Sequence, residues 1–186
     1  MSFAPNQPAA LDSGSHGAII VRMAANPSPP RGTFHGEVVG IFIASQEGGP
    51  TKGLNHVRAI SGEGLEGDRY FSSREPDSDP SKRSEITLIE AEALEAAERD
   101  YDVKFEPGDS RRNLVTRAVA LNHLVGRTFR AGDAVLEGVK LCEPCQYLEG
   151  LTRPGARKAF IHRGGLRARI VRSGAIRVGD SVLPDA

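Results

Sequence analysis

Tryptophan is missing from this 186-residue chain, and only 5% of its residues are aromatic. Proteins that hold single-stranded nucleic acid stack its bases on aromatic rings, so this composition argues against that function. The chain also lacks a continuous apolar run of the ~18–20 residues that a membrane helix needs. Its N-terminus lacks the basic start and the long apolar stretch of a signal peptide. We therefore expect a cytoplasmic protein that binds neither nucleic acid nor a membrane.

The chain has no excess of charge, because 24 basic side chains balance 24 acidic ones. The two signs are nevertheless segregated: residues 61–110 are mostly acidic and residues 140–186 are mostly basic. A basic C-terminal part favours an anionic ligand, although a solvated surface gives the same bias. The length and a hydrophobic share of 39% are typical of one globular domain with a real core.

Residues that favour turns and coil dominate two parts of the sequence. Residues 1–33 are rich in Ala, Pro, Ser and Gly and end in NPSPPRG. This composition predicts a flexible leader, followed by a domain at residues 34–186. Residues 71–85 combine two prolines with many charges, which predicts a mobile loop and a candidate lid.

Short segments rich in β-branched residues predict a mostly β fold. The stretches GEVVGIFIAS and HVRAI favour strands, and RTFRAGDAVLEGVKLCE predicts two strands joined near Gly132 and Asp133. Ser173 and Gly174 predict a hairpin turn into AIRVGDSVL. Many short strands with turn signals and a single long helix indicate a closed or nearly closed β-barrel rather than a parallel sheet.

The stretch GGLRARIV alternates between two faces of a strand. Leu166, Ala168 and Ile170 share one face, because side chains alternate along a strand. If these residues face the core, Arg167 and Arg169 point away from it. We therefore expect both arginines to face solvent or a partner.

One main helix is predicted at residues 88–99, with Thr87 and Glu90 as a capping box. Its apolar side chains form one stripe: Ile89, Ala93, Ala96 and Ala97. Pro144 suits the first position of a short helix that Gly150 would end. ARKAF predicts a further helical turn.

Both cysteines, Cys142 and Cys145, lie in VKLCEPCQYLEG. A disulfide is disfavoured, because cytoplasmic thiols stay reduced and this loop closes too few residues to stabilise the fold. A structural zinc site needs four ligands, and the histidines show no H-x-x-x-H spacing. A thioredoxin-type redox pair would need a βαβ context that is missing here. These exclusions leave two alternatives for the pair: a working thiol at one of the two positions, or buried cysteines that act as small hydrophobic residues.

Five motifs in this order resemble the MOSC domain, which is named for the C-terminal part of molybdenum cofactor sulfurases: GLEGDRY, ITLIEAEAL, PGDSRRNLV, CEPC and GGLRARIVRSGAIRVGDSV. The resemblance spans roughly Gly36 to Leu183. It implies a MOSC-type β-barrel with one main helix and short peripheral helices, here as a stand-alone bacterial-type module. It also implies that Cys145 handles sulfur or contacts the molybdenum cofactor. The sequence departs from many stand-alone relatives in having Ser110-Arg111-Arg112 where they have a Gly-Glu pair.

Three residues are candidates for the chemistry. Cys145 is the expected reactive thiol and metal ligand, because the thiolate is the form that attacks and that binds metals. A helix opened by Pro144 would place it in the first turn, which favours an anion. Cys142 is either a resolving thiol, which releases a carried sulfur as a disulfide forms, or a buried core residue. His162 is either a proton donor in the reduction of an N-hydroxyl group or a surface histidine.

Amide, guanidinium and glycine residues around the motifs are candidates for holding the cofactor. An amide donates and accepts at once, which suits a pterin edge, and guanidinium groups suit phosphate or a molybdenum oxo group. The same residues also serve as turn caps and solvated side chains. The candidate set is Asn113, Arg111, Arg112, Arg69, Gly67 and Arg163. Asp68 is expected to stabilise a turn.

Two functions follow from the resemblance. In the first, the domain binds the molybdenum cofactor through Cys145 and reduces N-hydroxylated small molecules with electrons from a separate redox protein. In the second, Cys145 carries sulfur from a desulfurase to a cofactor under assembly. Pyridoxal phosphate would then be found only on that partner. A regulatory barrel without catalysis is the third alternative.

Overall fold

The computed structural model describes residues 34–71 and 84–185, and the structural statements that follow concern these residues. They belong to one compact unit, residues 31–186. The predicted leader at residues 1–33 lies outside the described residues, as does most of the predicted loop at residues 71–85.

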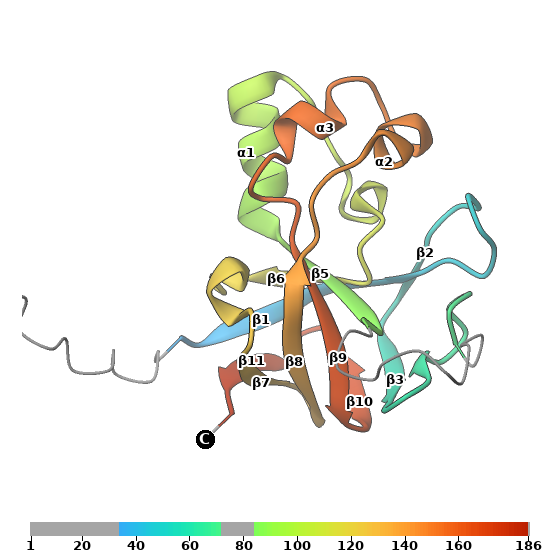
Figure 1. The fold of residues 1–186 in the computed structure, drawn as a ribbon, viewed down its shortest axis with the longest axis vertical. Coiled ribbons are helices and arrows are strands. Elements are labelled where there is room, and N and C mark those ends of the chain that lie inside the picture. Colours follow the sequence, from blue (N-terminus) through green and yellow to red (C-terminus); the bar gives the residue numbers. More distant parts are fainter. Residues whose placement is uncertain (1–33, 72–83, 186) are drawn as a thin grey trace, which may run out of the picture. The chain divides into compact units, whose positions relative to one another are not determined.

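Seven strands close into a barrel (Figure 1). They are β1 (Gly36–Ile43), β5 (Ile86–Glu90), β6 (Leu114–Arg117), β7 (Thr128–Ala131), β8 (Ala134–Leu141), β9 (Leu166–Arg172) and β11 (Ser181–Pro184). Their order is β11-β7-β8-β9-β5-β6-β1, and β1 pairs with β11 to close the ring. Only β5 and β6 run parallel. The sequence-based prediction of a mostly β, closed barrel is confirmed.

Four further strands among the described residues lie beside the barrel or extend it. Strand β2 (Lys52–Leu54) continues the sheet next to β1, while β10 (Gly174–Arg177), β3 (His56–Ile60) and β4 (Gly64–Leu65) form a second sheet. The predicted hairpin at Ser173 and Gly174 is wrong, because β10 pairs with β3 and not with β9. A Cβ at Gly174 would lie 2.4 Å from the carbonyl carbon of Asp133, so glycine permits a close crossing here.

Three α-helices gather at one end of the barrel (Figure 1). They are α1 (Ala91–Tyr101), α2 (Gln146–Leu151) and α3 (Ala156–Ala159), and two single 3₁₀ turns, η2 (Pro107–Ser110) and η3 (Leu121–Leu124), accompany them. We call α1, η2, α2, α3 and their connections the helical layer. No helix among the described residues has the length and apolar character needed to cross a membrane.

The main helix begins at Ala91, because residues 86–90 belong to strand β5. The predicted capping box is wrong. The Thr87 hydroxyl donates instead to the side-chain oxygen of Asn113 (2.9 Å), and the Glu90 carboxylate accepts from the backbone N–H of Leu121 (2.7 Å). Both side chains therefore join separate strands and turns of the fold.

The short helix before α3 also differs from its prediction. It begins at Gln146 rather than Pro144, and Gly150 lies inside it. Cys145 has extended backbone angles and is the residue just before the helix.

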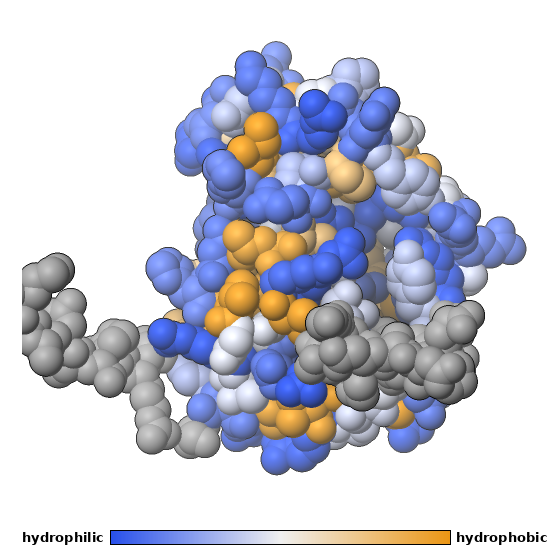
Figure 2. Space-filling view, in the orientation of Figure 1, coloured by the Kyte–Doolittle hydropathy of each residue, from blue (hydrophilic) through white to orange (hydrophobic). Residues whose placement is uncertain are grey.

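Two apolar cores stabilise the two parts. The barrel core contains Leu88, Leu136, Phe129 and the buried face of β9, so the predicted alternation of that strand is confirmed. The core of the helical layer contains Leu94, Phe160 and five alanines. In Figure 2 the helical end is mostly hydrophilic, whereas apolar side chains gather over the barrel strands in view.

Candidate functional site

A cleft of about 370 Å³ lies where the barrel meets the helical layer. Its walls come from the end of β1, the residues after β4, the start of β5, the segment before β6 and the segment between β8 and α2. Six of the nine residues predicted from the sequence as site residues line it: Cys142, Cys145, Arg69, Arg111, Arg112 and Asn113.

The two cysteines differ in accessibility. Cys145 is exposed, whereas Cys142 is 2% exposed, and both thiols are free. Burial of Cys142 is what its alternative as a core residue predicts, and a role as resolving thiol stays a prediction.

Arg112 is the buried cation of the cleft, with only 8% of its surface exposed. Its guanidinium donates to the carbonyl oxygens of Gly164 (2.9 Å) and Cys142 (3.2 Å). These bonds hold the cysteine-bearing segment against the chain that enters β9. Within residues 34–71 and 84–185, no carboxylate lies within ion-pair distance of this guanidinium.

The pKa of Arg112 reports which groups lie near it. Burial lowers this pKa, Cys142 raises it, Arg167 lowers it and Cys145 raises it. A guanidinium remains protonated in proteins, so the positive charge persists in the cleft. A buried charge without a counter-ion in the described part of the chain favours binding of an anion.

Arg167 adds a second positive charge, and it points away from the barrel core as expected. It is half-buried and lines the cleft. Its position opposite Thr87 and Lys140 lies at the end of the sheet that the helical layer covers. Arg169, by contrast, pairs with Glu137 (2.6 Å) on the outside of the barrel.

Arg111 and Arg69 lie on the remaining walls. Arg111 donates to the carbonyl oxygen of Gly49 (3.0 Å). Arg69 lies over the ring of Tyr70, with its guanidinium carbon 4.4 Å from the centroid, and its Nε is buried without a hydrogen-bond partner among the described residues. Gly67 does not line the cleft. It adopts a φ of +81°, which makes the turn that leads to Arg69.

Asn113 holds the walls together. Its amide oxygen accepts from the backbone N–H and hydroxyl of Thr87, and its amide nitrogen donates to Phe42 (3.2 Å) and Asp68 (3.3 Å). Asp68 also accepts from the backbone N–H of Ala44 (3.1 Å). The side chain of Asn113 is thus fully used within the protein, so its clearest role is to join three strands at the cleft.

The other two predicted site residues lie away from this cleft. His162 is exposed, and its carbonyl oxygen accepts from Asn122 (2.8 Å). Arg163 pairs with Asp100 (3.2 Å) in the helical layer. Neither side chain lines the cleft.

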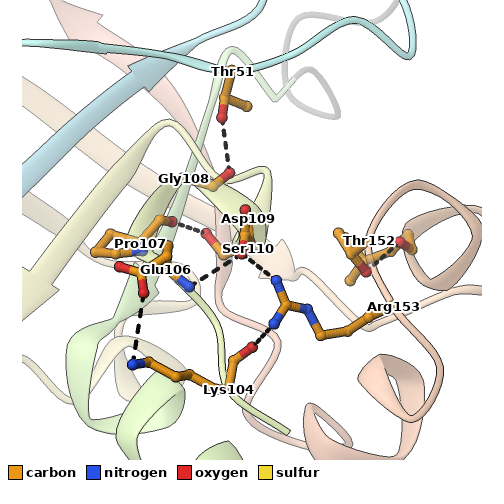
Figure 3. Close-up of polar contacts among 10 residues, drawn as sticks. Thr51, Lys104, Glu106, Pro107, Gly108, Asp109, Ser110, Thr152 and Arg153 are labelled. Atoms are coloured by element: carbon orange, nitrogen blue, oxygen red, sulfur yellow. Dashed lines mark hydrogen bonds and ion pairs between the residues drawn. The ribbon is translucent and has the colours of Figure 1, made fainter.

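The turn before Arg111 is fixed from several directions (Figure 3). Arg153, which follows α2, donates to the carbonyl oxygen of Lys104 and pairs with Asp109. On the opposite side of the turn, Thr51 donates to the carbonyl oxygen of Gly108 (3.0 Å). These contacts position the arginine pair that follows the turn.

Most lining residues were not among the site residues predicted from the sequence, and Arg167, Tyr70 and Tyr147 are three of them. Their signals were present, because Tyr70 follows Arg69 directly and Tyr147 stands two residues after Cys145. Neither tyrosine belongs to an apolar pattern of its segment, which is a sign of a residue that is not needed for the core.

Comparison with known proteins finds one family model and several solved structures that resemble this chain. The MOSC domain family model matches residues 53–183. The YuaD protein of Bacillus subtilis is 19% identical, with a TM-score of 0.68 over 81% of this chain and 96% of that one. YiiM from Geobacillus stearothermophilus is 17% identical, with a TM-score of 0.61 over 81% and 75%. YiiM from Escherichia coli is 14% identical, with a TM-score of 0.57 over 83% and 70%.

No curated protein matches the chain in sequence. These solved structures show a shared fold alone, because their sequence identities to this chain are too low to transfer an activity to it. The family model, however, covers most of the sequence and includes every lining residue of the cleft except Phe42, Ile43, Ala44 and Thr51. The chain belongs to the MOSC domain family, a family generally linked to binding of the molybdenum cofactor.

Proposed function

We propose that the cleft binds an anionic molybdenum cofactor, with Cys145 as the protein's ligand to the metal. One observation carries this assignment: the exposed thiol of Cys145 shares a cleft with the buried guanidinium of Arg112, which has no counter-ion in the described part of the chain. A thiolate is a soft ligand for a metal, and a guanidinium is the usual partner of phosphate and oxo groups.

The donor set fits such a cofactor. Among the described residues no three His, Cys, Asp or Glu side chains come together as a metal site. A metal in this cleft would therefore need most of its ligands from a cofactor, with one thiolate from the protein. Arg112 and Arg167 would hold anionic groups of the cofactor, and Arg69 lines the same cleft as a further cation.

When bound, this cofactor supplies two-electron redox chemistry. The proposed reaction is reduction of a small N-hydroxylated compound, with electrons from a separate donor protein. Residues of this chain bind and orient: Arg112 fixes the cysteine-bearing segment, and Asn113 fixes the opposite walls. His162 has no role in this proposal, because its side chain does not line the cleft.

The test is the molybdenum and pterin content of protein purified from a host that makes the cofactor, measured beside reductase activity. We expect both components in the wild type, with most of the molybdenum lost in Cys145→Ser and most of the pterin lost in Arg112→Gln. Arg172→Gln, which removes an exposed arginine of β9, is the matched control and should retain both. A wild-type protein without molybdenum, pterin and reductase activity would overturn the proposal.

A sulfur carrier is the second candidate, because the exposed Cys145 is within reach of a partner protein. Its thiol would accept a sulfur atom from a desulfurase as a persulfide and pass it to an external acceptor, since Cys142 is buried. Intact mass after incubation with a cysteine desulfurase and cysteine should show one added sulfur atom, absent in Cys145→Ala. An adduct that persists in this variant would exclude the carrier function.

A further inference from the structure

A groove of about 520 Å³ lies on the side of α2 that faces away from the cleft. One side of the helix lines the cleft, through Tyr147, Leu148 and Leu151. The other side lines the groove, through Gln146 and Glu149. Residues three or four apart share a helix face, so α2 is a wall between the two hollows. A helix with its side chains is ~10–12 Å across, which sets the distance from the groove to the cleft.

Helix α3 and the residues after it form the facing wall. Helices α2 and α3 pack against each other at one end of the barrel (Figure 1). Arg157 and Lys158 of α3 line the groove and are exposed. Neither has a carboxylate within ion-pair distance among the residues that the structure describes, and the ammonium of Lys158 lies 5.6 Å from the centroid of the Tyr101 ring. The groove therefore presents two cations that no acidic side chain neutralises.

The acidic side chains around the groove are occupied or lie elsewhere. Glu149 is the one acidic residue that lines it, and its carboxylate accepts from the backbone N–H of Arg157 (2.8 Å). On α1, which packs against α3, Asp100 pairs with Arg163 (3.2 Å). Two further acidic residues at this end of α1 do not line the groove: Glu98 and Asp102. The whole chain carries no net charge, so an acidic partner is attracted only where cations gather, as they do here.

Ile161 adds an apolar surface to these cations. It lines the groove and is 49% exposed, and among the described residues no other leucine or isoleucine is exposed. Protein interfaces combine apolar contact at the centre with charges at the rim, and the charges guide the encounter. Redox proteins meet through small interfaces, below ~1,200 Å² of buried surface, so a single groove suits a transient partner of this kind.

We propose that the groove between α2 and α3 is the docking surface for an acidic electron-transfer protein. The partner's role rests on the proposed reductase function. Reduction of an N-hydroxyl group breaks the N–O bond, takes up two electrons and two protons, and leaves an amine and water. A reduced flavin on the partner supplies both electrons and is oxidised, and the protons come from water. A partner docked in the groove is separated from the cleft by α2 alone.

The test uses flavodoxin, a small acidic flavin protein, as the probe. We expect it to bind the wild type with an affinity that falls as salt rises, measured by calorimetry. Arg157→Glu with Lys158→Glu should weaken binding by about tenfold or more, because two attractions become repulsions. Ile161→Ser should weaken it by about threefold. With reduced flavodoxin as donor, kcat/KM for an N-hydroxylated substrate should fall in the same order. With reduced methyl viologen, a small donor that needs no docking, it should stay unchanged.

Arg127→Glu with Arg130→Glu is the matched control, because it changes the net charge equally at exposed positions around β7. It should leave binding and both activities unchanged. Equal binding of flavodoxin by the wild type and the groove variant, or no binding at low salt, would overturn the docking surface even if methyl viologen supports reduction. Binding that depends on the groove, in a protein without molybdenum or reductase activity, would support the docking surface and reject the proposed function.

Discussion

The barrel and the helical layer are built differently. The barrel core is filled by large, fully buried side chains such as Phe129, Leu136 and Leu166. In the helical layer five of the eleven core residues are alanines, and the large contact is a pair of rings, Phe105 and Phe160, with centroids 4.6 Å apart. Larger side chains remove more apolar surface from water, so the barrel contributes most of the stability.

The buried polar groups lie where these two parts meet. Among the described residues, the buried polar or charged side chains are Ser110, Arg112 and Thr116, all in the short segment that leads from η2 into β6. The cleft opens beside this segment. The two parts therefore differ in packing, and the cleft of the proposed function opens where they meet.

Gly165→Ala is the substitution that we expect to destabilise the contact between the barrel and the helical layer most. Gly165 has a φ of +101°, and a Cβ there would lie 1.9 Å from the carbonyl oxygen of Leu88, a backbone atom of β5 that cannot move aside. We expect a loss of more than ~4 kcal/mol in the free energy of unfolding, or a chain that does not fold. Gly62→Ala, at φ +83° with open space around it, should cost only ~1–2 kcal/mol. Equal losses in urea unfolding would contradict the steric explanation.

Matched leucine truncations compare the two cores directly. Leu136→Ala removes a fully buried side chain from the barrel, and Leu148→Ala removes one from α2, which has six residues and borders the cleft. Large-to-small changes in cores cost ~2–5 kcal/mol, and the cost falls where the surroundings can relax. We expect Leu136→Ala near the top of this range and Leu148→Ala near the bottom. The reverse order in urea unfolding would show that the helical layer is the more rigid part.

Arg112→Met tests the boundary itself. Methionine keeps the apolar stem but leaves the carbonyl oxygens of Gly164 and Cys142 without their donor, which costs ~1–3 kcal/mol. We expect local opening around Cys142, seen as alkylation of this buried thiol about tenfold faster under native conditions, since ~1.4 kcal/mol is tenfold in an opening equilibrium. Arg172→Met should leave the rate unchanged. An unchanged rate in Arg112→Met would show that other contacts hold the segment.

The smallest expected effect is the pH dependence of stability that comes from Glu90, the last residue of β5 before α1. Burial raises the pKa of this carboxyl above its ordinary value of 4.5, against the lowering effect of the hydrogen bond from Leu121. A raised pKa favours the protonated form in the folded state. The resulting stability is fully present below the unfolded-state pKa and is lost as pH rises through the raised folded-state pKa.

Glu90→Gln keeps an acceptor for Leu121 but cannot ionise. Relative to the wild type, we expect this variant to gain stability as pH rises from 4.5 through the raised pKa, by no more than a few degrees in Tm, since the side chain is half-buried. Thermal unfolding at several pH values checks this. A variant whose Tm advantage shrinks towards neutral pH would contradict the assignment.

Much of the fold was predictable, because barrel strands have strong local patterns. The alternation of Leu166, Ala168 and Ile170 and the turn at Gly132 and Asp133 both correspond to observed structure. The turn at Ser173 was misread, since the partner of the next strand is β3, more than a hundred residues away in the sequence. A local turn signal contains no information about such a distant partner.

The site was predictable only in part. Cys145, Arg112 and Asn113 lie in motifs of the family, and all three line the cleft. Arg167 was not predicted as a site residue, because strand alternation tells which side faces the core and not which part of the outer side another layer covers. Thr87 was misread because its hydroxyl suits a helix cap as well as the contact with Asn113 that it makes in the structure.

The barrel is closed by pairing Gly36 with Val182, residues from nearly opposite ends of the domain. Bringing such distant segments together loses chain entropy before any contact compensates for it, and domains rich in such pairings fold in ~milliseconds to seconds. A chain that emerges gradually during synthesis cannot complete the ring until β11 has been made. Until then the edges of β1 and β7 remain open to pairing with other chains. The incomplete domain is therefore prone to aggregation, which chaperones prevent.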